Sequence, residues 1–165
     1  MRRGLLVVAV AFTALLLQAS LIARLPLPGG WPDLPLLCVL AFALCGGPLH
    51  GAIVGFGVGL AADVLPPADH TIGRLALAFA VAGYVAGLVE DAEERSVVTT
   101  MVLVAFGSAV AVLVFAGVGA LVGDPRVTGT AVAHSLAATV LYDVVLAPFV
   151  VPLLAAAVRR AEPAA

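Results

Sequence analysis

Six long apolar runs, separated by short segments rich in proline, glycine or charge, limit how this chain can fold. A helix that crosses the hydrocarbon core of a bilayer needs about 20 apolar residues. Of the 165 residues, 63% are hydrophobic and 11% are charged, and the mean hydropathy is +1.20, which excludes an ordinary soluble domain. We therefore expect an all-α integral membrane protein, a single polytopic domain over residues 1–165 with six transmembrane helices at roughly 5–23, 34–45, 49–65, 74–89, 97–122 and 131–158.

Two of these runs leave alternatives open. The run 34–45 rises only about 18 Å as a helix, which is short for a full crossing. Together with 49–65 it forms either a tilted pair of crossing helices, which we favour, or a partly re-entrant hairpin. The first run follows Arg2 and Arg3 and has small residues after Gln18, as a cleaved signal peptide does, but its apolar stretch continues beyond that point.

The arginines predict the orientation of the chain. Six crossings place both termini on one side, and cytoplasmic loops are enriched in positive charge. With the N-terminus inside, five arginines are cytoplasmic and three are outside: Arg2, Arg3, Arg95, Arg159 and Arg160 against Arg24, Arg74 and Arg126. We expect a multi-pass protein with both termini in the cytoplasm. The apolar composition predicts contact with membrane lipid. The charges form no single basic face, so we expect no contact with nucleic acid.

Glycines recur at helical spacing in two of the runs. The first set lies four residues apart and leads to Asp63, and a shorter set follows in the next run: Gly47, Gly51, Gly55 and Gly59, then Gly83 and Gly87. On a helix this spacing draws one stripe without side chains, and in lipid such a stripe lets another helix approach closely. The stripe either packs the protein against itself or forms a groove that receives another protein.

Two aspartates lie within or beside the apolar runs. Asp63 is near the end of its run, where it is either solvated or caps the following Pro-Pro turn. Asp143 is near the middle of the last run, where an ionised carboxylate costs at least about 2.5 kcal/mol and needs a partner or a proton. We expect a hydrogen-bonded or protonated group that fixes helix packing, with an ion or proton path as the alternative. The candidate partners are His50, His134, Tyr84 and Tyr142.

No enzymatic constellation is evident in the sequence. Ser108 and His134 supply the residue types of a serine protease without its sequence context. Paired histidines, a His-Glu motif and cysteines at metal-binding spacing are all missing from the sequence. We therefore expect a protein that is not an enzyme, with no catalytic residues, no metal and no cofactor.

The run GFGVGLAADVLPPADHTIGRLALAFAVAGYVAG, residues 55–87, resembles the middle region of the rod shape-determining protein MreD family. That family has a glycine-spaced helix, Gly-Leu, two residues, Asp, a turn, a glycine and an Ala-Leu-rich helix. The matching residues here are Gly59, Leu60, Asp63, Gly73, Leu75 and Ala76. The family also places a polar residue, often Asn, five positions before a proline, where this chain has Asp143 and Pro148. The turn after Asp63 is longer than usual, and Asp143 carries a carboxyl group where an amide is common.

The resemblance implies a non-catalytic membrane subunit of the bacterial cell-elongation machinery, which builds peptidoglycan. It would lie in the bacterial plasma membrane beside a single-span MreC-like protein and act indirectly with MreB and the wall glycosyltransferase and transpeptidase pair. The family's fold is similar to the substrate-binding component of energy-coupling-factor transporters. The alternative function is therefore a vitamin- or small-molecule-binding membrane component, with Trp31, Asp69, His70 and Arg126 as loop residues for its pocket.

Overall fold

The computed structural model describes residues 2–22, 30–65, 71–89 and 96–161, and this part of the chain contains six α-helices and no strand. The helices are α1 (Arg2–Ser20), α2 (Leu34–Gly46), α3 (Pro48–Val64), α4 (Arg74–Gly87), α5 (Val97–Val122) and α6 (Gly129–Ala161). The all-α prediction is confirmed for these residues, and each helix begins and ends within three residues of its expected bounds. Residue 23, where the first helix was expected to end, lies outside the described residues, as do Arg24 and Arg95.

Local sequence signals explain several helix ends. Asp33 caps α2 and Ser96 caps α5, each accepting a hydrogen bond from a backbone N–H of the first turn. Pro35 stands in the first turn of α2, where a missing N–H does no harm. Gly123 ends α5 in the left-handed conformation, with a φ of +79°, which glycine adopts without strain. The breaks between the apolar runs are therefore the helix ends.

Helix α2 is the centre of the bundle, since it contacts every other helix. Its residues from Pro35 to Leu44 are all buried, on every face of the helix. A helix that is apolar all round belongs in an interior. Its 13 residues rise about 20 Å, less than the ~30 Å of a bilayer core. Helix α2 is thus a short interior helix covered by the longer ones.

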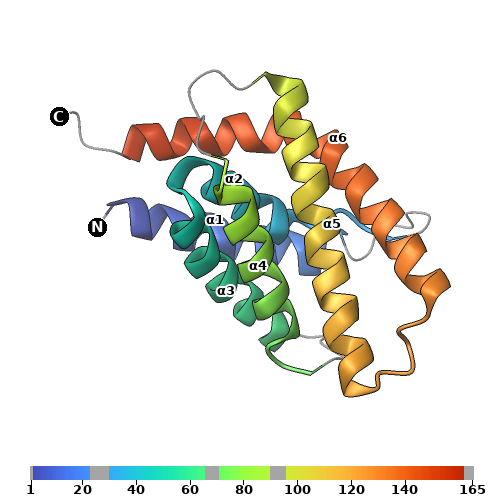
Figure 1. The fold of residues 1–165 in the computed structure, drawn as a ribbon. Helices are drawn as coiled ribbons and strands as arrows, with labels where there is room; N and C mark the ends of the chain where they lie inside the picture. The colour runs from blue at the N-terminus through green and yellow to red at the C-terminus, as the bar shows by residue number, and fades with distance from the viewer. Residues whose placement is uncertain (1, 23–29, 66–70, 90–95, 162–165) are drawn as a thin grey trace.

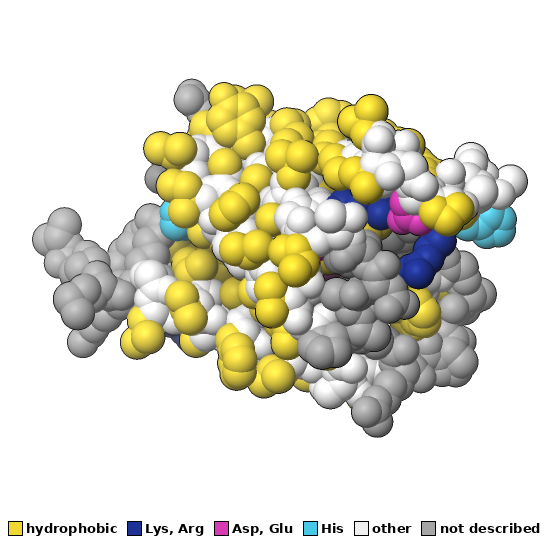
Figure 2. All heavy atoms as spheres, turned by 90° about the horizontal axis from the view of Figure 1, so that it is seen from below, with side chains coloured by type: hydrophobic (Ala, Val, Ile, Leu, Met, Phe, Trp, Pro, Cys, Tyr) yellow, Lys and Arg dark blue, Asp and Glu magenta, His cyan; other side chains and the backbone are white. Residues whose placement is uncertain are grey.

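The five helices around α2 direct large apolar side chains outward. Examples from each of them are Leu5, Ile53, Leu77, Phe106 and Phe149. Figure 2 shows one face of the molecule, which hydrophobic side chains cover over most of its described area. Soluble monomers rarely expose apolar patches larger than a few hundred Å². Of the described helices, α5 and α6 are long and apolar enough to cross a membrane, while α1 to α4 are shorter apolar helices.

Helix α6 changes direction along its length (Figure 1). It contains Pro148 and Pro152, and a proline inside a helix removes a backbone hydrogen bond and bends it. Val151 between the prolines, and Leu154 and Val158 beyond them, are part of the buried core. The start of α1 and the end of α6 lie on the same side of the molecule (Figure 1).

Candidate functional site

Four polar side chains from four parts of the chain lie around the start of α2, two of them buried and two half-buried. We call them the buried polar centre: Gln18 of α1, Asp33 before α2, Ser108 of α5 and Asp143 of α6. Ser108 and Asp143 are both 0% exposed. The Ser108 hydroxyl donates to Asp143 Oδ2 at 2.7 Å, and the backbone N–H of Asp33 donates to Asp143 Oδ1 at 2.9 Å. Each carboxylate oxygen of Asp143 therefore has a donor, as a buried polar group requires.

The same centre satisfies the backbone at the start of α2. The N–H of Leu34 donates to Gln18 Oε1 at 3.2 Å, and that of Leu36 donates to Asp33 Oδ1 at 3.0 Å. Pro35 has no N–H to satisfy. The first N–H groups of a helix lack partners within the helix, and a lipid interior offers no water to replace them. The start of α2 therefore lies beside α6 with these N–H groups satisfied by side chains.

The partners of Asp143 differ from those that the sequence suggested. We considered His50, His134, Tyr84 and Tyr142, but its hydrogen bonds go to Ser108 and to the backbone of Asp33. Tyr84 and His134 are exposed on α4 and α6. One signal in the sequence points to this site, because Asp33 occupies the N-cap position ahead of a helix with proline in its first turn.

Asp63 holds the start of α4. It is 1% exposed and accepts hydrogen bonds from the backbone N–H groups of Gly73 at 2.8 Å, Leu75 at 3.1 Å and Ala76 at 3.1 Å. Gly73 precedes α4 with a φ of +96° and has no side chain to cap the helix itself. Asp63 is therefore not solvated, and the Pro-Pro turn that was its other expected target lies outside the described residues. Asp63 supplies the missing cap of α4 from the end of α3.

The glycine stripe of α3 packs against α4. A Cβ atom added to Gly51 would collide with the carbonyl oxygen of Gly83, and one added to Gly55 would collide with that of Phe79. A Cβ atom on Gly59 would also meet the α4 backbone. Backbone atoms cannot rotate out of the way as side chains do, so only glycine fits. Because α4 occupies this face, we correct the hypothesis that these glycines form a groove for a partner.

Gly47, the first glycine of one set, and Gly87, the last glycine of the other, lie close together where α3 begins and α4 ends. Gly47 lies between α2 and α3 with a φ of +82°, so it forms the turn and is not part of the helical stripe. A Cβ atom on Gly87 would lie 2.6 Å from the carbonyl oxygen of Gly47. Gly47 is thus required for its backbone conformation, while Gly87 is required for close approach.

An ion pair that the sequence did not reveal joins α4 to the end of α5. Arg74 is 5% exposed; its Nε donates to the carbonyl oxygen of Phe115 and its Nη1 to Asp124 Oδ2, both at 2.7 Å. Its guanidinium lies 3.7 Å from the centroid of the Phe115 ring. A side chain on Gly119 would displace that guanidinium. Hydrogen bonds from Arg74 and then from the Arg126 backbone lower the pKa of Asp124.

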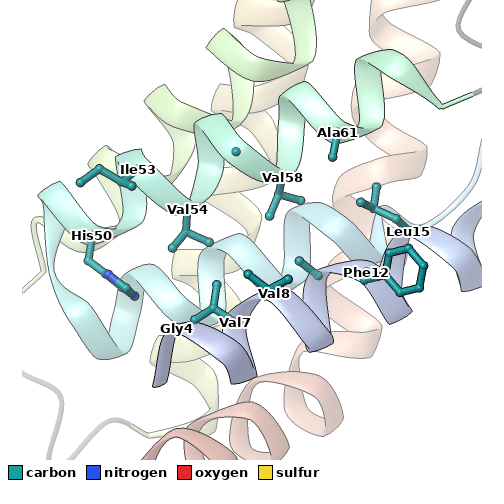
Figure 3. A pocket seen from close by; sticks show the side chains of 12 residues that line it. Gly4, Val7, Val8, Phe12, Leu15, His50, Ile53, Val54, Val58 and Ala61 are labelled. Carbon is teal, nitrogen blue, oxygen red and sulfur yellow. The ribbon is translucent and has the colours of Figure 1, made fainter. Parts of the chain in front are cut away.

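An apolar groove lies between α1 and α3, with a volume of about 480 Å³ (Figure 3). Val7 and Phe12 of α1 face Val54 and Val58 of α3 across it, and His50 lies at the end near the start of α1. Gly57 also lines the groove, and nothing lies within 4 Å of a Cβ atom added there. Gly57 therefore borders open space, unlike the glycines of the stripe.

Two smaller cavities lie beside α5 and α6, with volumes of about 260 and 180 Å³. Arg126 lines the larger one, whereas Trp31 is exposed and is not among the lining residues. Asp69 and His70, the other loop residues suggested for a vitamin pocket, lie outside the described residues. Among the described residues, no three His, Cys, Asp or Glu side chains come together as a metal site would require.

No protein-family model, no curated protein and no solved structure matches this chain. The functional assignment therefore depends on the geometry described above and on the sequence motif of residues 55–87.

Proposed function

We propose that this protein is a non-catalytic scaffold of the bacterial plasma membrane, of the rod shape-determining type, which holds a single-span MreC-like partner. One observation carries the proposal: the buried polar side chains Asp63, Arg74, Ser108 and Asp143 all hold helices of this chain together, while the outer helices present apolar faces. These polar groups have structural partners, and the apolar faces suit contact with lipid or with another membrane helix.

We place the partner in the groove between α1 and α3. Its walls are apolar and match a transmembrane helix in chemistry. Gly57 on the floor gives a partner backbone room to approach, whereas the stripe formed by Gly51, Gly55 and Gly59 is occupied by α4. Through this partner the protein acts indirectly with MreB and with the glycosyltransferase and transpeptidase that build the wall.

Filling the groove should release the partner without unfolding the protein. Gly57→Leu adds a side chain to the groove lining at a position where no atom lies within 4 Å of the new Cβ atom, so it should obstruct a docked helix more than it disturbs this chain. An overpacked contact costs typically 1–3 kcal/mol, so recovery of a co-expressed MreC-like partner in mild detergent should fall about tenfold. The thermal midpoint of the isolated protein should remain close to that of the wild type.

Gly117→Leu is the matched control, because Gly117 is also helical and exposed with open space around it but lies on α5, away from the groove. It should leave recovery of the partner unchanged. Full recovery with a folded Gly57→Leu protein would remove the groove assignment. Failure to recover any single-span partner with the wild type would remove the scaffold function itself.

We further propose that both termini are cytoplasmic: an even number of crossings places them on one side, and the arginine distribution selects the cytoplasm. A reporter that is active only in the cytoplasm should be active when fused after Ala165. The same fusion with a reporter active only outside the cytoplasm should be silent, and the reverse pattern would overturn the orientation.

A further inference from the structure

The two cavities beside α5 and α6 adjoin each other. They share three lining residues, Val112, Phe115 and Ser135. The larger one extends toward Arg126, and the smaller one extends inward to Asp33 of the buried polar centre. Small-molecule sites typically occupy about 300–1,000 Å³, with apolar walls and a few well-placed polar groups. Taken together, the two adjoining cavities have a volume in this range and similar walls; we call them the joined cavities.

Two carboxyl groups lie at the inner end of this space. The carboxyl group of Asp33 lines it, and Asp143 lies next to it, bonded to the Asp33 backbone. The hydrogen bonds of these two carboxyl groups come from the Leu36 and Asp33 N–H groups and from the Ser108 hydroxyl, and none comes from a basic side chain of the described residues. The nearby arginine, Arg74, is already paired with Asp124. Among the described residues, no basic side chain hydrogen-bonds to either carboxyl group, and Arg126 lines the outer cavity.

The pKa of Asp33 also indicates a carboxyl group without a basic partner among the described residues. Burial raises its pKa to about 6, although the hydrogen bond from Leu36 acts in the opposite direction. The titratable neighbours are the Asp143 carboxyl group and the Cys38 thiol, and neither carries positive charge. At neutral pH the carboxyl group is mostly ionised, and a cation beside it would compensate for its burial.

The remaining walls suit an ammonium group attached to hydrocarbon. Ser135 and Thr139 line the inner cavity, and their hydroxyl groups can accept hydrogen bonds from N–H donors. Phe79 and Phe115 supply aromatic surface, against which aliphatic or aromatic carbon packs.

We propose that the joined cavities bind a molecule that carries a protonated amine, with the ammonium group at Asp33 and the hydrocarbon part against Phe115. The amine belongs either to a free small molecule or to the ethanolamine headgroup of a phospholipid. This activity goes beyond the scaffold role and does not depend on the groove between α1 and α3.

The test uses the full chain, purified in detergent, with 2-phenylethylamine as the probe and 2-phenylethanol as its neutral counterpart. The amine should raise the thermal midpoint by a few degrees and the alcohol should not. Asp33→Asn removes the charge but keeps a good N-cap residue for α2, so the protein should fold while its apparent affinity for the amine falls about tenfold.

A second arm identifies the lipid source. In nanodiscs, native mass spectrometry should find phosphatidylethanolamine retained in preference to phosphatidylglycerol, and Asp33→Asn should abolish the preference if the headgroup is the natural ligand. A response to the free amine without lipid preference identifies a soluble ligand. An equal response to the alcohol, a response unchanged in Asp33→Asn, or the absence of both responses would overturn the proposal.

Discussion

Replacing Gly55 by leucine should prevent α3 and α4 from packing and leave little folded protein. An added Cβ atom there collides with the carbonyl oxygen of Phe79, and no rotamer change relieves a clash with backbone. Overpacking typically costs 1–3 kcal/mol, and we expect the upper end or beyond because α3 and α4 form the most extensive helix pair of the bundle. At about 2–4 °C per kcal/mol, the thermal midpoint should fall by roughly 6–12 °C or more.

Gly57→Leu and Gly117→Leu serve as controls for the substitution itself. Both positions are helical and open, so leucine gains up to about 1 kcal/mol of helix propensity and meets no atom of the chain. Size-exclusion profiles and thermal midpoints in detergent compare the three variants. A folded Gly55→Leu protein with an unchanged midpoint would contradict the packing of α3 against α4.

Replacing Asp143 by leucine should destabilise the protein nearly as strongly. The Asp33 N–H and the Ser108 hydroxyl would lose their acceptor in a water-free interior. Leaving a buried polar group unsatisfied costs about 1–3 kcal/mol, so two such groups cost about 2–6 kcal/mol. The thermal midpoint in detergent should fall by roughly 4–24 °C at about 2–4 °C per kcal/mol.

Asp143→Asn separates hydrogen bonding from charge. The amide oxygen can accept from the Asp33 N–H, and its NH₂ group can donate to the Ser108 hydroxyl, which then acts as the acceptor. We expect this variant to fold with a midpoint close to that of the wild type. If Asn proved as damaging as Leu, a structural role for Asp143 would be insufficient, and an ionised or proton-carrying carboxyl group would be required.

The sequence predicted most of the helix pattern because the apolar runs stop where proline, glycine or polar caps appear. It also predicted that Gly55 and Gly59 face another helix, since a spacing of four places them on one side. Spacing does not identify the helix that fills the stripe, and the assignment to a partner failed for this reason. The sequence did hold a signal for the cap of α4. Gly73 precedes that helix without a capping side chain, and Asp63 is a carboxylate ten residues before it.

The buried polar centre could not be predicted from the sequence, for a different reason. Ser108 and Asp143 are 35 residues apart, and Asp33 and Asp143 are 110 residues apart. Periodicity within a helix does not specify pairs at such separations. Arg74 posed a similar problem, since an arginine beside an apolar run resembles a loop charge until Asp124 and Gly119 are seen to enclose it.

The position of α2 has a consequence for biosynthesis. The backbone N–H of Asp33 finds its acceptor 110 residues further along the chain, so this one group at the start of α2 lacks its final partner until α6 has been made. At about 5–20 residues per second, the ribosome needs roughly 5–22 s to supply it. During this interval the nascent chain must keep α2 in the translocon, in a chaperone or at the water interface. The central helix of the finished bundle should therefore be among the last to reach its final place.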